Sequence, residues 1–251
     1  MPTIAQRFPM TSSLLLWALV WELVGRLGLV ELLPPLTAVL GAMSEVVMTA
    51  TFARAALDTV VAFLAGMAIA VAAGIPIGIL MGRFKVADDF LGLWVNLFLS
   101  APLTALVPVI MILFGFGQTT IIVTVVLFAI WIIVLDTRAG VRNASPSLVE
   151  MARSFGATPA QLYGKILILA ALPEILTGIR LGMIRGVEGV VIGQLLVSIV
   201  GLGELFELYS RSFLLEQFWA LTLILFAFAI LLAEGVAALE RRVEYFAGTR
   251  G

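Results

Sequence analysis

The stretch SPSLVEMARSFGATPAQLYGKI, residues 145–166, is a largely polar segment inside an apolar chain. Its pattern predicts two amphipathic helical pieces that meet at Gly156. Ser147 is expected to cap the first piece, and Glu150, three residues later, completes a capping box. Gly156 is expected to end that piece, and the Thr158–Pro159 pair to start the next one.

One side of the first helical piece is apolar. Leu148, Met151, Ala152 and Phe155 recur at helical spacing in a segment that lies outside the apolar runs of the chain. A helix lying on a lipid surface would have the same pattern. Small residues beside Glu150, followed by a glycine turn, favour instead a knob that fits a groove in a soluble partner.

The composition of the whole chain predicts a membrane protein. Of 251 residues, 62% are hydrophobic and 12% are charged, whereas soluble proteins average about 45–50% and 25%. The net charge of -1 argues against nucleic acid as a partner. The chain contains no Cys and no His, which excludes disulfides, thiol nucleophiles and imidazole catalysis.

Six apolar runs have the length that a bilayer crossing requires. They lie at residues 12–30, 58–81, 90–114, 119–137, 175–199 and 218–239. Between the first two runs, Pro34 and Pro35 precede a short stretch that Thr37 can cap as a helix. That helix is too short to cross the membrane, and we expect it to lie along the interface.

Basic residues predict the direction of these spans. If the N-terminus is cytoplasmic, that side receives Arg7, Arg83, Lys85, Arg138, Arg142, Arg153, Lys165, Arg241, Arg242 and Arg250. The outer side then receives only Arg26, Arg54 and Arg211. This asymmetry follows the positive-inside rule and places both termini, together with residues 145–166, in the cytoplasm.

A ridge of small residues marks the second span. Its members recur every four residues: Ala62, Gly66, Ala70, Gly74, Gly78 and Gly82. Such a ridge lets another helix approach closely, and packing within one subunit is the favoured interpretation. Three prolines, Pro76, Pro102 and Pro108, are expected to break regular helix inside spans.

Charged residues offer little catalytic chemistry. Asp88 and Asp89 lie at a span boundary and are interpreted as solvated interfacial charge, because no third Asp is close enough in sequence to help them hold a metal. No phosphate-binding GxxxxGK[ST] loop is present. Arg185 and Glu188, three residues apart in the fifth span, either neutralise each other or contact a solute. Glu22 and Arg26 are expected to form a local pair.

Residues 150–169 resemble the cytoplasmic "EAA" loop of bacterial ABC-importer permeases. Glu150 stands at the Glu, Ala152 at the second Ala, Gly156 at the Gly and Ile166 at the Ile of that pattern. Met151 replaces the first Ala, Ile168 the usual Leu, and Leu169 the usual Pro, although Pro173 matches a second family proline.

The resemblance extends from about Leu33 to Glu240. LPPLTAV, GIPIGILMGR, LSAPLTALVPVIMILFGFG, DTRAGVRNASPSLVEMARSFGA and GLGELF are similar to the nitrate/sulfonate/taurine (NitT/TauT) branch of these permeases. Gln194 stands where many relatives have Glu, and Arg185 and Glu188 occupy a stretch that is commonly uncharged. The resemblance therefore indicates the branch but not the ligand.

This resemblance implies an all-α membrane protein with the type I ABC-importer permease fold. That fold has six transmembrane helices, an interfacial helix and a cytoplasmic coupling helix. The implied divisions are an N-terminal span and interfacial helix (1–54), the permease domain (55–240) and a cytoplasmic tail (241–251). The implied location is the bacterial inner membrane, where a homodimer binds two cytoplasmic ATPase subunits and receives solute from an extracytoplasmic binding protein.

The same resemblance implies which residues carry function. ATPase coupling falls on Glu150, Met151, Ala152, Phe155, Gly156 and Ala157. The translocation cavity is expected to include Arg185, Glu188 and Gln194. No catalytic residue, metal or cofactor of its own is expected, since the partner subunits bind ATP. Two alternatives remain: a membrane-embedded enzyme acting on lipid or isoprenoid substrates, and a structural membrane scaffold.

Overall fold

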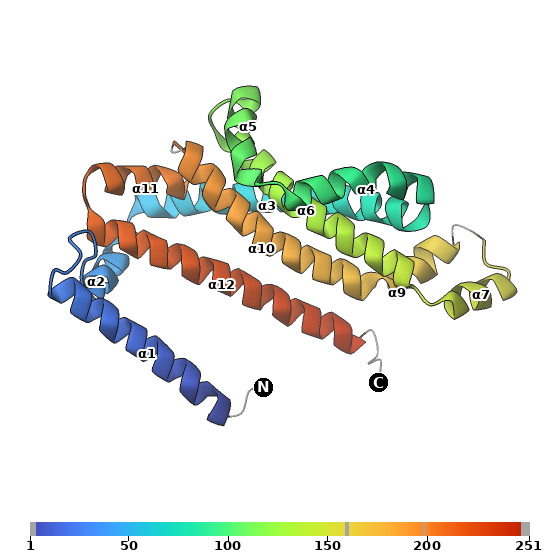
Figure 1. The fold of residues 1–251 in the computed structure, drawn as a ribbon, viewed down its shortest axis with the longest axis horizontal. Helices are drawn as coiled ribbons and strands as arrows, with labels where there is room; N and C mark the ends of the chain where they lie inside the picture. Colours follow the sequence, from blue (N-terminus) through green and yellow to red (C-terminus); the bar gives the residue numbers. More distant parts are fainter. Residues whose placement is uncertain (1–3, 159–160, 198, 247–251) are drawn as a thin grey trace.

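A computed structural model describes residues 4–158, 161–197 and 199–246, and these residues are helical with short connections. In chain order the elements are α1 (Ile4–Arg26), α2 (Leu36–Val47), α3 (Ala50–Arg83), α4 (Lys85–Ser100), η1 (Leu103–Leu106), α5 (Val107–Phe114), α6 (Gln118–Asn143), α7 (Pro146–Ser154), η2 (Leu162–Leu167), α9 (Ile168–Ala170), α10 (Leu172–Val197), α11 (Leu202–Arg211) and α12 (Leu215–Phe246). The predicted all-helical fold is confirmed. The molecule is elongated, with α7 at one end and α2 and α11 at the other (Figure 1).

Helices α3, α6 and α10 form the centre of the molecule, with α6 between the other two. Glycines of α3 face α6 in a constant register, since Gly66 meets Val125 and Gly82 meets Val141, so the two helices run parallel. Helix α10 is antiparallel to α6 and presents a second set of glycines to it, such as Gly182 against Ile133. The predicted packing of the small-residue ridge within one subunit is confirmed.

Among all the described helices, two have the length and apolar character needed to cross a membrane. Helices α3 and α6 meet the requirement alone, and up to four spans result if α4 with η1–α5, and α10 with α11, each count as one, among the described residues. In the described part of α12, Leu215–Leu231 is a shorter apolar helix. The count of six spans therefore stays a prediction.

The predicted third span is not one straight helix. Helix α4 and the η1–α5 segment are bent by 99° where they meet. Ala101 is extended, with φ -74° and ψ 147°, because a residue before proline avoids the helical region. The prediction that Pro76 and Pro108 also break helices is wrong: α3 continues through Pro76, and Pro108 occupies the first turn of α5, where a proline is tolerated.

The predicted short helix after Pro35 is present as α2, but its cap comes from another helix. The backbone N–H and the hydroxyl of Thr37 both donate to the Glu22 carboxylate, each over 2.9 Å. Glu22 also accepts a hydrogen bond from Arg26 at 2.5 Å, which confirms their predicted pairing. Thr37 is therefore not the N-cap, and Glu22 of α1 satisfies the first turn of α2 instead.

Candidate functional site

The segment 145–166 projects from the end of α6. Helix α7 begins at Pro146, whose ring presets the helical φ angle. Ser145 is the N-cap residue without a side-chain cap, and its hydroxyl lies 2.7 Å from that of Ser147. The predicted cap by Ser147 is wrong, because the helix starts at Pro146, two residues earlier than a cap at Ser147 requires.

A glycine turn ends α7 as predicted. Gly156 has φ +75°, a conformation that glycine adopts without strain. Its N–H donates to the Arg153 carbonyl at 2.9 Å, and the N–H of Ala157 donates to the Ala152 carbonyl at 3.0 Å. Both bonds satisfy carbonyls of the last helical turn, as in a Schellman motif.

The second helical piece begins at Thr158, as predicted. The Thr158 N–H donates to the Gln161 side-chain oxygen at 3.0 Å, and the Gln161 N–H donates to the Thr158 hydroxyl at 3.4 Å. These two bonds make a reciprocal capping box. Pro159, the predicted first helical residue, lies outside the described residues.

The predicted coupling residues separate into two groups. Ala152 is 3% exposed and packs with Leu162 and Leu167 of η2, and Ala157 is partly buried against the same cluster. Met151 is 49% exposed and Phe155 is 85% exposed, and Glu150 and Gly156 also face outward. Ala152 and Ala157 therefore hold the segment together from inside, and the role of all six residues in ATPase coupling stays a prediction.

A buried carboxylate pairs with two partly exposed arginines near the end of α6, before the chain enters α7. The Asp88 side chain, 9% exposed, accepts a hydrogen bond from Arg138 Nη2 at 2.8 Å and pairs with Arg142 Nη1 at 3.1 Å. This joins the start of α4 to the last two turns of α6. The interpretation of Asp88 as solvated charge is wrong, whereas Asp89 is exposed as expected.

We expect Asp88→Ala to destabilise the protein strongly. The variant leaves the partly buried Arg138 without its carboxylate. Breaking a fully buried pair costs about 3–5 kcal/mol, and a loss at the lower end of that range is expected for this partly buried one. An apparent Tm measured in detergent should fall by about 6 °C or more for a chain of this size. Asp89→Ala is the matched control and should leave Tm unchanged; equal Tm values for the two variants would contradict the assignment.

Arg185 and Glu188 contact each other on α10. Arg185 Nη1 lies 3.0 Å from Glu188 Oε2, and the two side chains are 61% and 46% exposed in the single chain. Both border a cleft of about 240 Å³ whose other walls come from α4, η1 and α6, including Pro102 and Trp131. The predicted mutual neutralisation is thus present, and contact of either residue with a solute stays a prediction.

Gln194 is not among the residues that line this cleft, and its place in the translocation cavity stays a prediction. Its side chain is 2% exposed, and its Nε2 donates to the Thr59 hydroxyl oxygen at 2.9 Å. The same oxygen accepts from the Leu202 N–H at 3.2 Å. Helix α11 also packs closely against α10 here, since a Cβ on Gly203 would lie 2.2 Å from the backbone carbonyl oxygen of Gln194. Gln194 therefore joins α3, α10 and α11 inside the subunit.

Known proteins resemble this chain over most of its length. The family model described as "Binding-protein-dependent transport system inner membrane component" matches residues 74–245. The taurine transport system permease protein TauC of Escherichia coli (strain K12) is 32% identical over 69% of this chain and 63% of its own length. The putative aliphatic sulfonates transport permease protein SsuC of Bacillus subtilis (strain 168) is 30% identical over 79% of this chain and 74% of its own length.

Solved structures share the fold. A structure of the MetNI methionine ABC transporter, described as inward facing, covers 76% of this chain and 95% of the compared chain with a TM-score of 0.65 and 21% identity. An amino acid ABC transporter gives a TM-score of 0.64 at 20% identity.

The match with TauC spans less than two thirds of that protein.

Proposed function

The chain belongs to the family of binding-protein-dependent transport system inner membrane components, and from this premise we propose that it is the permease subunit of an ATP-driven importer. The subunit moves a small solute by alternating access between the two sides of the membrane. It supplies the pathway, and partner subunits hydrolyse ATP. No observation on the described residues favours the alternative of a membrane enzyme acting on lipid or isoprenoid substrates.

The observation that carries this proposal is the construction of the α7–η2 segment. Ala152, Leu162 and Leu167 give the segment its own small core, so it keeps its shape outside the helical bundle. Met151 and Phe155 remain exposed on it, and large exposed apolar side chains on a shaped surface indicate a protein contact. A helix of this kind transmits the movement of an ATPase subunit to α6, from which it projects.

The proposed assembly has two copies of this chain, two cytoplasmic ATPase subunits and an extracytoplasmic binding protein. The end that holds α7 carries Arg138, Arg142 and Arg153, and the opposite end carries Arg54 and Arg211. With the remaining basic residues, this asymmetry supports a cytoplasmic location for α7 and for both termini. The membrane is then the bacterial inner membrane.

The solute is proposed to be a small anion or a small organic compound of the taurine or sulfonate type. The support comes from TauC, a taurine transport system permease protein, and SsuC, a putative aliphatic sulfonates transport permease protein. The cleft beside Arg185 and Glu188 is the place where the pathway of this chain is expected to pass.

Copurification tests the proposal directly. The tagged chain, coexpressed with candidate ABC ATPase subunits from the same organism, should be recovered in detergent as a complex of two permeases and two ATPases. In liposomes the complex should hydrolyse ATP faster when the loaded binding protein is added. A permease that purifies without any ATPase, although folded and dimeric, would contradict the proposed function.

A further inference from the structure

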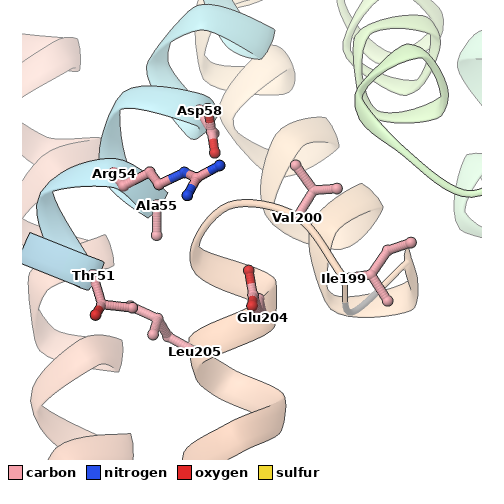
Figure 2. A pocket seen from close by; sticks show the side chains of 8 residues that line it. All are labelled: Thr51, Arg54, Ala55, Asp58, Ile199, Val200, Glu204 and Leu205. Atoms are coloured by element: carbon pink, nitrogen blue, oxygen red, sulfur yellow. The ribbon is translucent and has the colours of Figure 1, made fainter.

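A second cleft lies at the end of the molecule opposite to α7. Its volume is about 360 Å³, and it lies between the first turns of α3, the turn that follows α10, and the start of α11. Three charged side chains line it: Arg54, Asp58 and Glu204. Figure 2 shows the Arg54 guanidinium extending from α3 into the cleft beside Asp58, while Glu204 reaches toward the same space from α11.

These three charged groups are not used in ion pairs of the described chain. Arg26, Arg185 and Arg211 each pair with a carboxylate on their own helix, whereas none of the described ion pairs includes Arg54, Asp58 or Glu204. Arg54 precedes Asp58 by four residues, the order in which an ion pair on a helix is the weaker one. The cleft thus presents one cation and two carboxylates that have no ion-pair partner among the described residues.

One partly buried and two buried hydrogen bonds fix the walls of this cleft. The Gln118 side chain donates to the Asp58 carbonyl at 3.0 Å. Thr59, the next residue, accepts hydrogen bonds from Gln194 and from the Leu202 N–H, which ties α3 to the segment that carries Glu204. The charged groups are therefore presented by a backbone that is already in place, and preorganisation of this kind lowers the cost of binding.

We propose that this cleft binds a small zwitterion, a molecule that carries both an ammonium group and a sulfonate or carboxylate group. The anionic group pairs with Arg54, and the ammonium donates hydrogen bonds to Asp58 and Glu204. A simple anion would be repelled by the two carboxylates, and a simple cation would leave Arg54 without an anionic partner in the cleft. The volume lies near the lower end of the range of about 300–1,000 Å³ for small-ligand sites, and Ala55, Val200 and Leu205 border the space for a short aliphatic linker.

The inference deepens the proposed importer function and rests on it, because it names the class of solute that the permease receives from outside. The proposed orientation places this cleft on the extracytoplasmic side, where a binding protein delivers its cargo. Solute binding in this cleft does not depend on the contact between α7 and the ATPase. An experiment can therefore contradict the solute site and the importer function separately.

Calorimetry on the full-length chain in lipid nanodiscs tests the inference without ATPase or binding protein. The probes are 2-aminoethanesulfonate, ethanesulfonate and ethylammonium, added at millimolar concentrations. We expect the zwitterion to bind at least about tenfold more tightly than either singly charged probe, since it alone makes both sets of charge-assisted hydrogen bonds. Arg54→Gln and Asp58→Asn should each weaken its binding by about tenfold or more.

Arg211→Gln is the matched control, because Arg211 lies on α11 but pairs with Glu207; it should leave binding unchanged. Absence of binding, equal binding of the three probes, or wild-type binding by Arg54→Gln and Asp58→Asn would overturn the inference. Wild-type Tm and ATPase copurification of these variants confirm that the fold and the proposed function persist. Loss of copurification in the unmodified chain would instead overturn the proposed function.

Discussion

Phe155→Asp is expected to release the ATPase subunits from the permease while the permease itself stays folded. Phe155 is the C-cap residue of α7 and is 85% exposed, so it makes little contribution to packing within its own chain. The adjacent Gly156 turn fixes the direction in which this side chain projects. A ring held outward in this way is suited to fill a pocket on a partner.

The expected size of this effect follows from burial. Moving a Phe side chain from water into an apolar contact contributes about 1.5–3 kcal/mol, and central aromatic contacts of an interface often cost more than about 2 kcal/mol when truncated. An aspartate in the same pocket adds the cost of burying an unpaired charge. Together these effects should weaken ATPase binding by about 100-fold or more. The measurement is the ATPase retained on tagged permease in detergent.

Phe213→Asp provides the matched control. Phe213 is 76% exposed and lies between α11 and α12, at the end of the molecule away from α7. Its φ of 52° is also tolerated by Asp. This variant should retain the ATPase at the wild-type level. If both variants retain it, the exposed side of α7 is not the ATPase contact, and the lipid-surface interpretation of the segment replaces it.

The parts of the fold that the sequence predicts are those with local causes. Gly156 ends α7 and Thr158 starts the next piece because each acts on residues within one turn of itself. The small-residue ridge of α3 is also visible from spacing alone. The helix that packs against this ridge cannot be identified from spacing, because no residue near Gly78 in the sequence indicates that Gly78 meets Thr137 of α6.

The errors concern contacts between distant residues. Asp88 is separated by 50 residues from Arg138 and Thr59 by 135 residues from Gln194, so neither buried contact leaves a local pattern. Helical spacing placed Ala152 and Phe155 on one face, but η2 covers only Ala152. Window-averaged hydropathy identified the third span but not its bend. The average depends only on which residues the window contains, and a change in helix direction does not alter it.

Gly78→Leu is expected to prevent the permease from folding. An added Cβ at this position would lie 2.6 Å from the Thr137 Cβ and 2.8 Å from the Val134 carbonyl oxygen. The second contact is with backbone, so a change of side-chain rotamer cannot relieve it. Helix α6 cannot simply move away, because on its other side a Cβ on Gly182 would lie only 2.7 Å from Ile133 Cγ1.

The cost of Gly78→Leu should exceed the usual range for overpacking, about 1–3 kcal/mol, and outweigh the gain of about 1 kcal/mol from replacing a helical glycine. Gly92→Leu in α4 is the control, since a Cβ there meets no atom within 4 Å. Size-exclusion chromatography and thermal unfolding in detergent should show a folded Gly92→Leu protein, at least as stable as the unmodified chain, and little folded Gly78→Leu protein. Equal recovery of both would mean that α6 can separate from α3. In that case α6 would not transmit movement from α7 to the rest of the bundle as part of a rigid three-helix unit.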